Sequence, residues 1–417
     1  MTLFPKKLFI RKCYVELVPL IEEILGTQDE CGKYYSAIIQ GTPGIGKSFL
    51  GFFLLLILAQ RGASVVYEHG PTKSSYYFTR NEVREGPSDA FRQEIKNPDV
   101  YYIVDSHVAA VANAKTILLT SPFKVHWKEV EKASGDFLYM PPWSEDEIEK
   151  CRALAYPAVG ADVVTANFAK WGGVARYVLQ FANHHGKQKN IDDAISKCDP
   201  EMIRKSVGNE FAKDDIIHRV FHIVPDATYK NGTHEFASRY VRDQVSLTHR
   251  RQLELFFASS SGIGALGSLM GYLFEDYAHL KLSEGGTFRI RRLGTNTIHQ
   301  IVIPKCKPVK YSNIKDAPKP KAGEYYIPKI PNLESVDSYA HPNLLFQVTV
   351  AAKHPIKQAG LHDILGVMNP SWDCRRVHQI FLHPPQLFFV VPQERFSDFE
   401  LLIMMPKELS APGTTLT

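Results

Sequence analysis

The sequence lacks paired cysteines, a membrane-spanning run and an apolar leader. Its cysteines are scattered without the close spacing of zinc knuckles or a disulfide framework, so a reducing compartment is expected. The apolar run Phe49–Ala59 is shorter than the about 20 residues that a bilayer-spanning helix needs, and we expect no membrane partner. Met1–Lys7 carries charge but no apolar core or cleavage site, so no conventional secretory signal is predicted. The six cysteines are Cys13, Cys31, Cys151, Cys198, Cys306 and Cys374.

A large excess of charge of one sign is also absent. The formal net charge is +5 at pH 7, which favours an anionic partner without identifying it. With 417 residues, 44% of them hydrophobic, the chain can form two or three domains with their own cores.

The most informative stretch is a glycine-rich loop that matches G-x-x-x-x-G-K-[ST] at every position. Its glycines let successive backbone N–H groups point at one anion, and the following helix adds its positive dipole end. Lys47 supplies charge for the outer phosphates, and the Ser48 hydroxyl supplies a ligand for Mg²⁺. We therefore predict binding of ATP and Mg²⁺. The loop consists of Gly41, Thr42, Pro43, Gly44, Ile45, Gly46, Lys47 and Ser48.

The segments that flank this loop have the required order. Tyr35–Gln40 is typical of a short buried strand, and Phe49–Ala59 suits a helix packed beneath the loop. The alternative, a glycine-rich turn without a ligand, does not account for this order of strand, loop and helix.

A second acid for the metal is predicted at Asp105. It ends the apolar run Val100–Asp105, as a Walker B aspartate does, and the alternative is a strand-end aspartate in a turn. Another strand-like segment, Ala63–Glu68, lies between the two motifs in sequence. This spacing resembles the additional-strand class of P-loop ATPases, so the predicted fold is an α/β parallel sheet with a helical lid.

Two further groups are candidates for the nucleotide site. Ser106 follows Asp105 where the class often has a catalytic glutamate, so Glu68 is the best substitute for orienting water; a solvated strand-end glutamate is the alternative. Gly172–Arg176 could open a helix whose Arg176 reaches the nucleotide, and packing is the alternative there. A further strand is predicted at Ile117–Ser121.

Beyond the sheet, the sequence changes character twice. A capping box at Ser144–Glu147 starts a helix, and the pattern from 146 to 250 predicts a helical lid and connector without repeats. Lysines then alternate with prolines across Lys305–Pro331, which predicts an extended loop. A linker role is favoured over contact with a phosphate backbone.

The C-terminal third contains a second set of candidate site residues. Gly271–Glu275 is helix-like, Phe288–Leu293 is a strand candidate, and Leu333–Asp337 precedes the strand-like Leu344–Val350. A helix glutamate, a strand-end aspartate and a polar residue on the next strand are the parts of a PD-(D/E)xK nuclease site. Such a site gathers Mg²⁺ to activate water against a phosphodiester.

Seven segments together resemble the NTPase–nuclease cores of Crinkler effectors and trypanosomatid retrotransposon hot spot proteins. They are GTPGIGKS, VYYIVDS, PPWS, GGVAR, GYLFE, ESVD and QVTVAAKH. The resemblance implies a P-loop ATPase fused to a restriction-endonuclease-like domain, with DNA or RNA as target and nuclear or cytoplasmic action. For Crinklers it also implies secretion and entry into a host cell nucleus, with host nuclear proteins as partners. The translocation header of Crinklers (L-F-L-A-K type) is not present.

Carried over by position, the resemblance implies a nuclease site at Glu275, Asp337 and Gln347, with Lys353 or His354 beside them. Glu275 and Asp337 would hold the metal. Gln347 is a neutral residue where the family pattern has an acid, and Thr349 stands where it has lysine. Without the family, a capped helix and a turn account for Glu275 and Asp337.

The predicted organisation is an NTPase core over 1–145, a helical lid and connector over 146–250, and a nuclease-like domain over 251–417. Two functions remain open. One is an ATPase that controls a nuclease, and the other is a nucleotide-switched nucleic-acid or chromatin adaptor.

Overall fold

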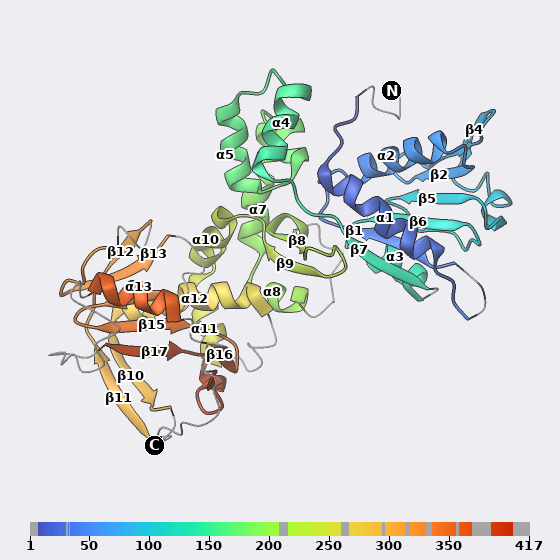
Figure 1. Cartoon of the computed structure of the whole chain (residues 1–417). Helices are drawn as coiled ribbons and strands as arrows, with labels where there is room; N and C mark the ends of the chain where they lie inside the picture. The colour runs from blue at the N-terminus through green and yellow to red at the C-terminus, as the bar shows by residue number, and fades with distance from the viewer. Residues whose placement is uncertain are drawn as a thin grey trace. The chain divides into compact units, whose positions relative to one another are not determined.

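A computed structural model of the chain shows two compact units, 1–248 and 249–417 (Figure 1). The described residues are 7–30, 32, 34–122, 124–132, 134–207, 216–259, 267–293, 297–312, 317–329, 336–355, 358–368 and 385–402.

The first unit is built on a seven-stranded sheet in the order β4-β3-β2-β5-β6-β1-β7. Strands β7, β1, β6, β5 and β2 run parallel, whereas β3 and β4 pair antiparallel at one edge. The strands are β1 Ser36–Gln40, β2 Val65–His69, β3 Ser74–Phe78, β4 Val83–Pro87, β5 Tyr101–Asp105, β6 Lys115–Thr120 and β7 Gly135–Tyr139.

Helices cover both faces of this sheet, so its central strands are buried along most of their length. On one face, α2 approaches so closely that a Cβ on Gly51 would lie 2.7 Å from Leu119. On the other face, Trp127 and Val130 of α3 pack against Ile38 and Leu118. The helical elements are α1 Lys12–Gly26, α2 Lys47–Gln60, η1 Glu94–Lys96 and α3 Lys124–Lys132.

The strand order confirms the additional-strand class of P-loop fold. Strand β6 lies between β1, which precedes the glycine-rich loop, and β5, which ends in Asp105. The segment predicted at 63–68 forms β2, which lies on the far side of β5. Strand β6 therefore separates the two motifs in the sheet, whereas β2 separates them in the sequence.

The segment after the sheet is mostly helical, as predicted, and the capping box is confirmed. The Glu147 N–H donates to Ser144 Oγ at 3.2 Å, and the Ser144 N–H donates to Glu147 Oε2 at 3.1 Å. The helical elements are α4 Glu145–Ala155, α5 Ala161–Trp171, the π-helix η2 Arg176–Gln180, α6 His185–Gln188, α7 Asn190–Lys197, α8 Pro200–Val207, α9 Ile217–Val220 and α10 Arg239–Thr248.

The prediction of a helical connector is wrong at one place. Strands β8 (Phe221–Pro225) and β9 (Gly232–Phe236) form an antiparallel hairpin. The Asp226 carboxylate organises its turn by accepting from the Thr228 N–H at 3.0 Å and from Asn231 Nδ2 at 2.8 Å. These side-chain bonds make a turn where the sequence predicted helix.

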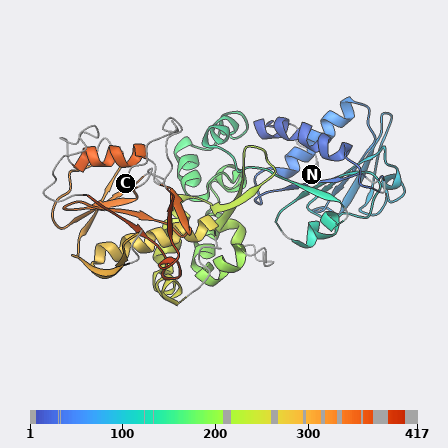
Figure 2. The same cartoon turned by 60° about the horizontal axis from the view of Figure 1, so that its bottom comes forward.

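The second unit is a smaller α/β layer around the sheet β12-β13-β14-β15-β17. Figure 2 shows α12 and α13 on opposite faces of this sheet. The α12 side buries Leu282 with Tyr325 and Phe346, and the α13 side buries Ile364 with Tyr339. The elements are α11 Arg250–Ser259, α12 Gly267–Glu284, β10 Gly286–Arg291, β11 Ile298–Ile303, β12 Lys307–Tyr311, β13 Glu324–Pro328, β14 Ser338–Ala340, β15 Leu344–Val348, β16 Lys353–Pro355, α13 Gln358–Met368, β17 Gln386–Val390, η5 Gln393–Arg395 and β18 Glu400–Leu402.

The prediction of an extended loop over Lys305–Pro331 is wrong in part. Strands β12 and β13 fall inside this segment and pair in parallel. They form because Tyr311 and Tyr326 bury their rings in the core on the α13 side. Residues 333–335 of the predicted acidic segment lie outside the described residues, whereas Asp337 lies within them. Among the described helices, none has the length and apolarity needed to cross a membrane.

Candidate functional site

The glycine-rich loop connects the end of β1 to the start of α2. Gly44 (φ 86°) and Gly46 (φ 103°) adopt left-handed backbone conformations that side chains disfavour. A Cβ on Gly46 would also lie 2.6 Å from the Tyr14 hydroxyl. Ser48 lies half-buried in the first turn of α2. The loop therefore has the backbone geometry that the motif requires.

Lys47 is buried, and its ammonium bonds the carbonyls of its own loop. Nζ donates to Gly41 O at 2.7 Å and to Thr42 O at 2.9 Å. Burial lowers the pKa of Lys47 to about 7; the Asp105 charge opposes this shift and the Arg176 charge adds to it. A bound polyphosphate would supply the negative charge that this ammonium lacks.

Asp105 ends β5 as a fully buried carboxylate. It accepts from the Tyr67 hydroxyl at 3.3 Å and from the Ser106 hydroxyl at 3.1 Å. His69 Nε2 lies 3.9 Å from Asp105 Oδ2. Burial lowers the pKa of His69, and the Asp105 charge opposes this shift. Each Asp105 oxygen accepts one side-chain hydrogen bond and keeps a second lone pair, which a metal could use.

Glu68 lies on the opposite face of the sheet from Asp105, which corrects its predicted role. In the parallel register Glu68 pairs with Val104, whereas His69 pairs with Asp105, and successive side chains in a strand alternate faces. Tyr67 and Leu119, on the Asp105 face, contact α2 at Gly51. Glu68 therefore points away from α2, and burial raises its pKa. Sequence reasoning chose the glutamate and missed the neighbouring histidine.

Arg176 packs directly on the glycine-rich loop. Its N–H donates to Gly44 O at 3.2 Å, and its side-chain carbons would meet a Cβ on Gly44 at 3.0 and 3.5 Å. Its guanidinium has no ion-pair partner among the described residues. A cavity of about 70 Å³ beside Pro43 is lined by Arg176, Trp171 and Tyr177. The structure thus brings Arg176 to the loop, where the sequence expected it.

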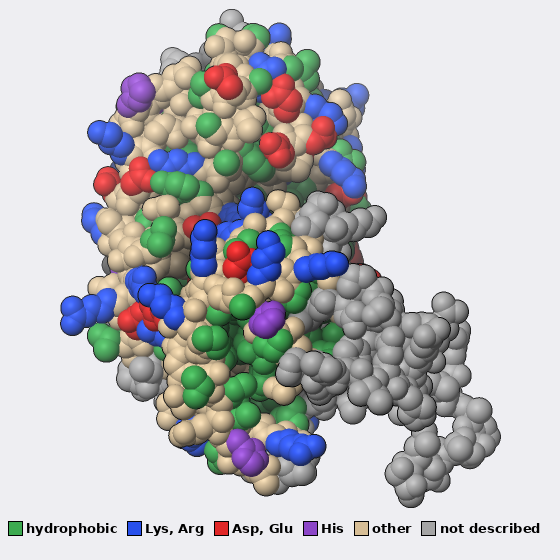
Figure 3. Space-filling view, turned by 90° about the vertical axis from the view of Figure 1, so that its left-hand side faces the viewer, with side chains coloured by type: hydrophobic (Ala, Val, Ile, Leu, Met, Phe, Trp, Pro, Cys, Tyr) green, Lys and Arg blue, Asp and Glu red, His purple; other side chains and the backbone are tan. Residues whose placement is uncertain are grey.

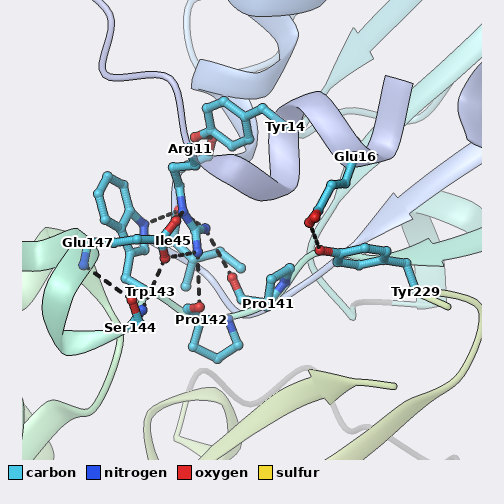
Figure 4. Close-up of polar contacts among 11 residues, drawn as sticks. Arg11, Tyr14, Glu16, Ile45, Pro141, Pro142, Trp143, Ser144, Glu147 and Tyr229 are labelled. Carbon is cyan, nitrogen blue, oxygen red and sulfur yellow. Dashed lines mark hydrogen bonds and ion pairs between the residues drawn. The ribbon is translucent and has the colours of Figure 1, made fainter. Parts of the chain in front are cut away.

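An N-terminal arginine, missed by sequence reasoning, joins the loop to the start of α4 (Figure 4). Arg11 is 1% exposed and donates to Ile45 O at 3.4 Å, to Pro141 O and Pro142 O at 3.0 Å each, and to Glu147. Its guanidinium lies 4.6 Å from the Trp143 ring. The only sequence signal was the capping box, which identified Glu147 but not this second bond.

Three more hydrogen bonds hold the loop from different elements. Trp143 Nε1 donates to Ile45 O at 2.6 Å, and the Tyr14 hydroxyl donates to Gly46 O at 2.8 Å. On the other side, the Ile223 N–H of β8 donates to Thr42 Oγ1 at 3.1 Å. The loop is thereby fixed by α1, by the β7–α4 connection and by the β8–β9 hairpin.

In the second unit, the structure brings together three of the predicted nuclease residues. Gln347 Nε2 and the Val348 N–H both donate to Asp337 Oδ2 at 2.7 Å. Burial, followed by the charge of Glu275 on α12, raises the pKa of Asp337 to about 7. Gln347 Oε1 is buried without a hydrogen-bond partner among the described residues. Asp337 thus contacts the Gln347 amide, and Glu275 lies close enough for its charge to act on Asp337.

The predicted basic residues lie on a separate two-stranded sheet. Lys353 and His354 lie on β16, which pairs with β18 rather than with the five-stranded sheet. His279 lies beside Glu275, with Nε2 3.6 Å from Glu275 Oε1 and Nδ1 2.9 Å from the Tyr325 hydroxyl. Its spacing of four from Glu275 on one helix could have identified it. Within the described ranges, no group of three His, Cys, Asp or Glu residues could hold a metal.

The strand order, the loop after β1 and the acid at the end of β5 define unit 1 as a P-loop NTPase fold. Unit 2 is a second α/β unit.

No family model matches the chain. Crinkler effector proteins 15 and 16 of Phytophthora infestans are each 26% identical to it, over 97% of this chain and 68% of theirs. Two solved structures are distantly similar. AMPPCP-bound DnaA from Aquifex aeolicus has a TM-score of 0.30 at 14% identity, over 67% of this chain and 90% of its own. RuvB from Thermotoga maritima, a Holliday junction branch migration motor, has a TM-score of 0.26 at 14% identity, over 72% and 94%.

Proposed function

We propose that unit 1 binds and hydrolyses ATP with Mg²⁺. The observation that carries this proposal is the position of Lys47. Among the described residues, its buried ammonium has only loop carbonyls as hydrogen-bond partners, and burial lowers its pKa. A triphosphate would accept from the loop N–H groups and from this ammonium at once.

Each chain residue near the loop has a distinct proposed task. The Ser48 hydroxyl and the Asp105 carboxylate hold Mg²⁺, which supplies charge neutralisation at the outer phosphates. Arg176, free of ion pairs among the described residues, contacts the phosphates from the connector side. His69, on the Asp105 face, replaces Glu68 as the candidate for orienting water.

We further propose that the nucleotide state controls unit 2, which acts on DNA or RNA. Glu275, Asp337 and the Gln347 amide oxygen would hold a divalent cation there. Within unit 1, the Thr42–Ile223 bond gives the β8–β9 hairpin a direct way to sense the loop. Similarity to Crinkler effector proteins supports an effector role in a host cell and its nucleus.

A second candidate function is a nucleotide-switched adaptor whose nuclease fold only binds nucleic acid or chromatin. The Gln347 side chain favours this adaptor. Its neutral amide donates a hydrogen bond to Asp337, whereas the second carboxylate of a nuclease site would repel the Asp337 carboxylate.

Two measurements test these proposals. Phosphate release by the full chain should require Mg²⁺ and should be lost in Lys47→Ala, with the exposed Lys150→Ala as matched control. Plasmid nicking with Mg²⁺, with and without ATP, separates the nuclease from the adaptor. ATP binding by Lys47→Ala as tight as by the parent would show that the loop assignment is wrong.

A further inference from the structure

A basic edge borders the β12 side of unit 2. The sequence from 305 to 329 contains seven lysines and two acids. Six of these lysines are exposed within the described residues, and the described acid, Glu324, accepts a hydrogen bond from Tyr326. We call the six lysines the lysine edge. They are Lys305, Lys307, Lys310, Lys319, Lys321 and Lys329.

The structure fixes the backbone that carries these lysines. The Tyr339 hydroxyl donates to Pro318 O at 2.6 Å, and the Tyr326 hydroxyl donates to Lys319 O at 3.1 Å. The Lys321 N–H in turn donates to the Tyr326 hydroxyl at 3.1 Å. The lysine-proline segment is therefore held on the sheet by two buried tyrosines, and it is not a free linker.

Protection of a sheet edge explains only part of this arrangement. Lysines on an outer strand discourage pairing with other chains, which accounts for Lys307 and Lys310 on β12. It does not account for Lys319 and Lys321, which lie outside any strand. Apart from Lys329, the lysine edge forms no ion pair with any described residue. Five lysines of the edge are thus exposed cations that form no ion pair with the described residues.

A cavity of about 430 Å³ adjoins this edge. Its wall includes Cys306, which lies between Lys305 and Lys307, and Ala322, which follows Lys321. Apolar groups such as Ile301 and Pro342 line it together with the amides of Asn343 and Gln386. Strands β12 and β13 lie on the left of Figure 1, the side that Figure 3 faces, where Lys and Arg side chains cross the view above apolar ones.

We propose that the lysine edge binds the phosphate backbone of a single-stranded nucleic acid and that the adjoining cavity accepts one of its bases. The proposal rests on the nucleic-acid target of the proposed function and specifies where that target binds. A row of cations matches the repeating charge of a backbone. An apolar cavity with amide groups suits an unstacked base, which a duplex does not offer.

The test uses the full chain and fluorescence anisotropy of a labelled mixed-sequence single strand across a salt series. The triple variant Lys310→Ala/Lys319→Ala/Lys321→Ala should bind about tenfold more weakly, and its log–log salt slope should fall by about 2, because each lost single-strand phosphate contact contributes about 0.7. The matched control removes the same charge from exposed lysines of unit 1: Lys96→Ala/Lys128→Ala/Lys189→Ala. All three proteins should bind ATP equally and give the same thermal melting profile, which checks the folding of unit 1 and of unit 2.

A separate substitution tests the cavity. Ala322→Leu, at an exposed position in the cavity wall, should weaken binding of a natural strand but not of an abasic strand of equal length. Duplex DNA should bind more weakly than the single strand.

The outcomes separate two failures. If the parent binds no nucleic acid at any salt, the nucleic-acid target of the proposed function fails. If the parent binds while the triple variant equals its control, that target stands and the lysine edge is the wrong surface. Equal competition by poly-glutamate, lost only in the triple variant, would assign the edge to an acidic polypeptide and overturn the proposal.

Discussion

Arg11 donates two hydrogen bonds to Glu147, from Nε at 3.2 Å and from a terminal nitrogen at 2.9 Å, although 136 residues separate them in sequence. The same guanidinium donates to Ile45 O inside the glycine-rich loop. The pair therefore fixes the N-terminal segment, the phosphate-binding loop and the start of α4 in one arrangement.

Arg11→Ala should destabilise unit 1 by about 3–5 kcal/mol, because it leaves the Glu147 carboxylate without its buried partner. ATP affinity should fall as well, since Ile45 O loses a donor. Urea unfolding and calorimetry measure the two effects. The control Arg61→Ala removes an exposed ion pair with Glu22 and should cost less than about 1 kcal/mol. Equal losses in both variants would contradict the role given to Arg11.

Asp105→Asn should weaken ATP binding in Mg²⁺ more than in EDTA. Asparagine lacks the negative charge of the Asp105 carboxylate, and only contact with the metal needs that charge. The exposed Asp99→Asn, on the turn before β5, is the matched control. Titration of ATP with and without metal measures the difference. An equal loss in both conditions would show that Asp105 supports the fold rather than the metal.

Glu68→Gln should leave the turnover number unchanged, because Glu68 lies on the sheet face away from α2. His69→Ala should lower turnover while sparing ATP affinity, since a group that orients water acts only in the chemical step. Steady-state phosphate release gives both constants. Slow turnover in Glu68→Gln with normal His69→Ala would restore the glutamate to the catalytic role.

Acidification should destabilise unit 1 through His222. Burial lowers the pKa of His222 to about 4, so between pH 6.5 and 4 the unfolded chain binds a proton that the folded chain excludes. Stability is then complete above about pH 6.5 and falls by on the order of 1 kcal/mol per pH unit below it. His222→Phe should reduce this dependence in urea titrations at pH 7 and 5, whereas the exposed His299→Phe should not. An unchanged pH slope in His222→Phe would refute this account.

Gln347→Glu should make unit 2 dependent on metal. Gln347 Nε2 now donates to Asp337 Oδ2, and a carboxylate there would repel it at the same distance. The melting temperature should fall in EDTA and recover in Mn²⁺, while Asp337→Ala should show no metal response. If Mn²⁺ left the Gln347→Glu melting temperature unchanged, these residues would not form a cation site.

The sequence by itself determined the elements of unit 1 that depend on local signals. The loop from Gly41 to Ser48, its flanking strand and helix, and the capping box at Ser144 all follow from residues that are neighbours in the chain. Positive φ angles at Gly44 and Gly46 and the short-range bond at Ser144 are set by the residues themselves. The acid at the end of β5 was found for the same reason.

Only the tertiary structure decided which side chains meet across the chain. Strand register places His69, not Glu68, beside Asp105, because a shift of one residue reverses the face. Buried tyrosine hydroxyls hold the lysine-proline segment on a sheet that composition alone did not predict. Arg11 meets Glu147, and Thr42 meets Ile223, through contacts between residues more than a hundred positions apart. Such partners depend on packing of the whole unit, which no local pattern encodes.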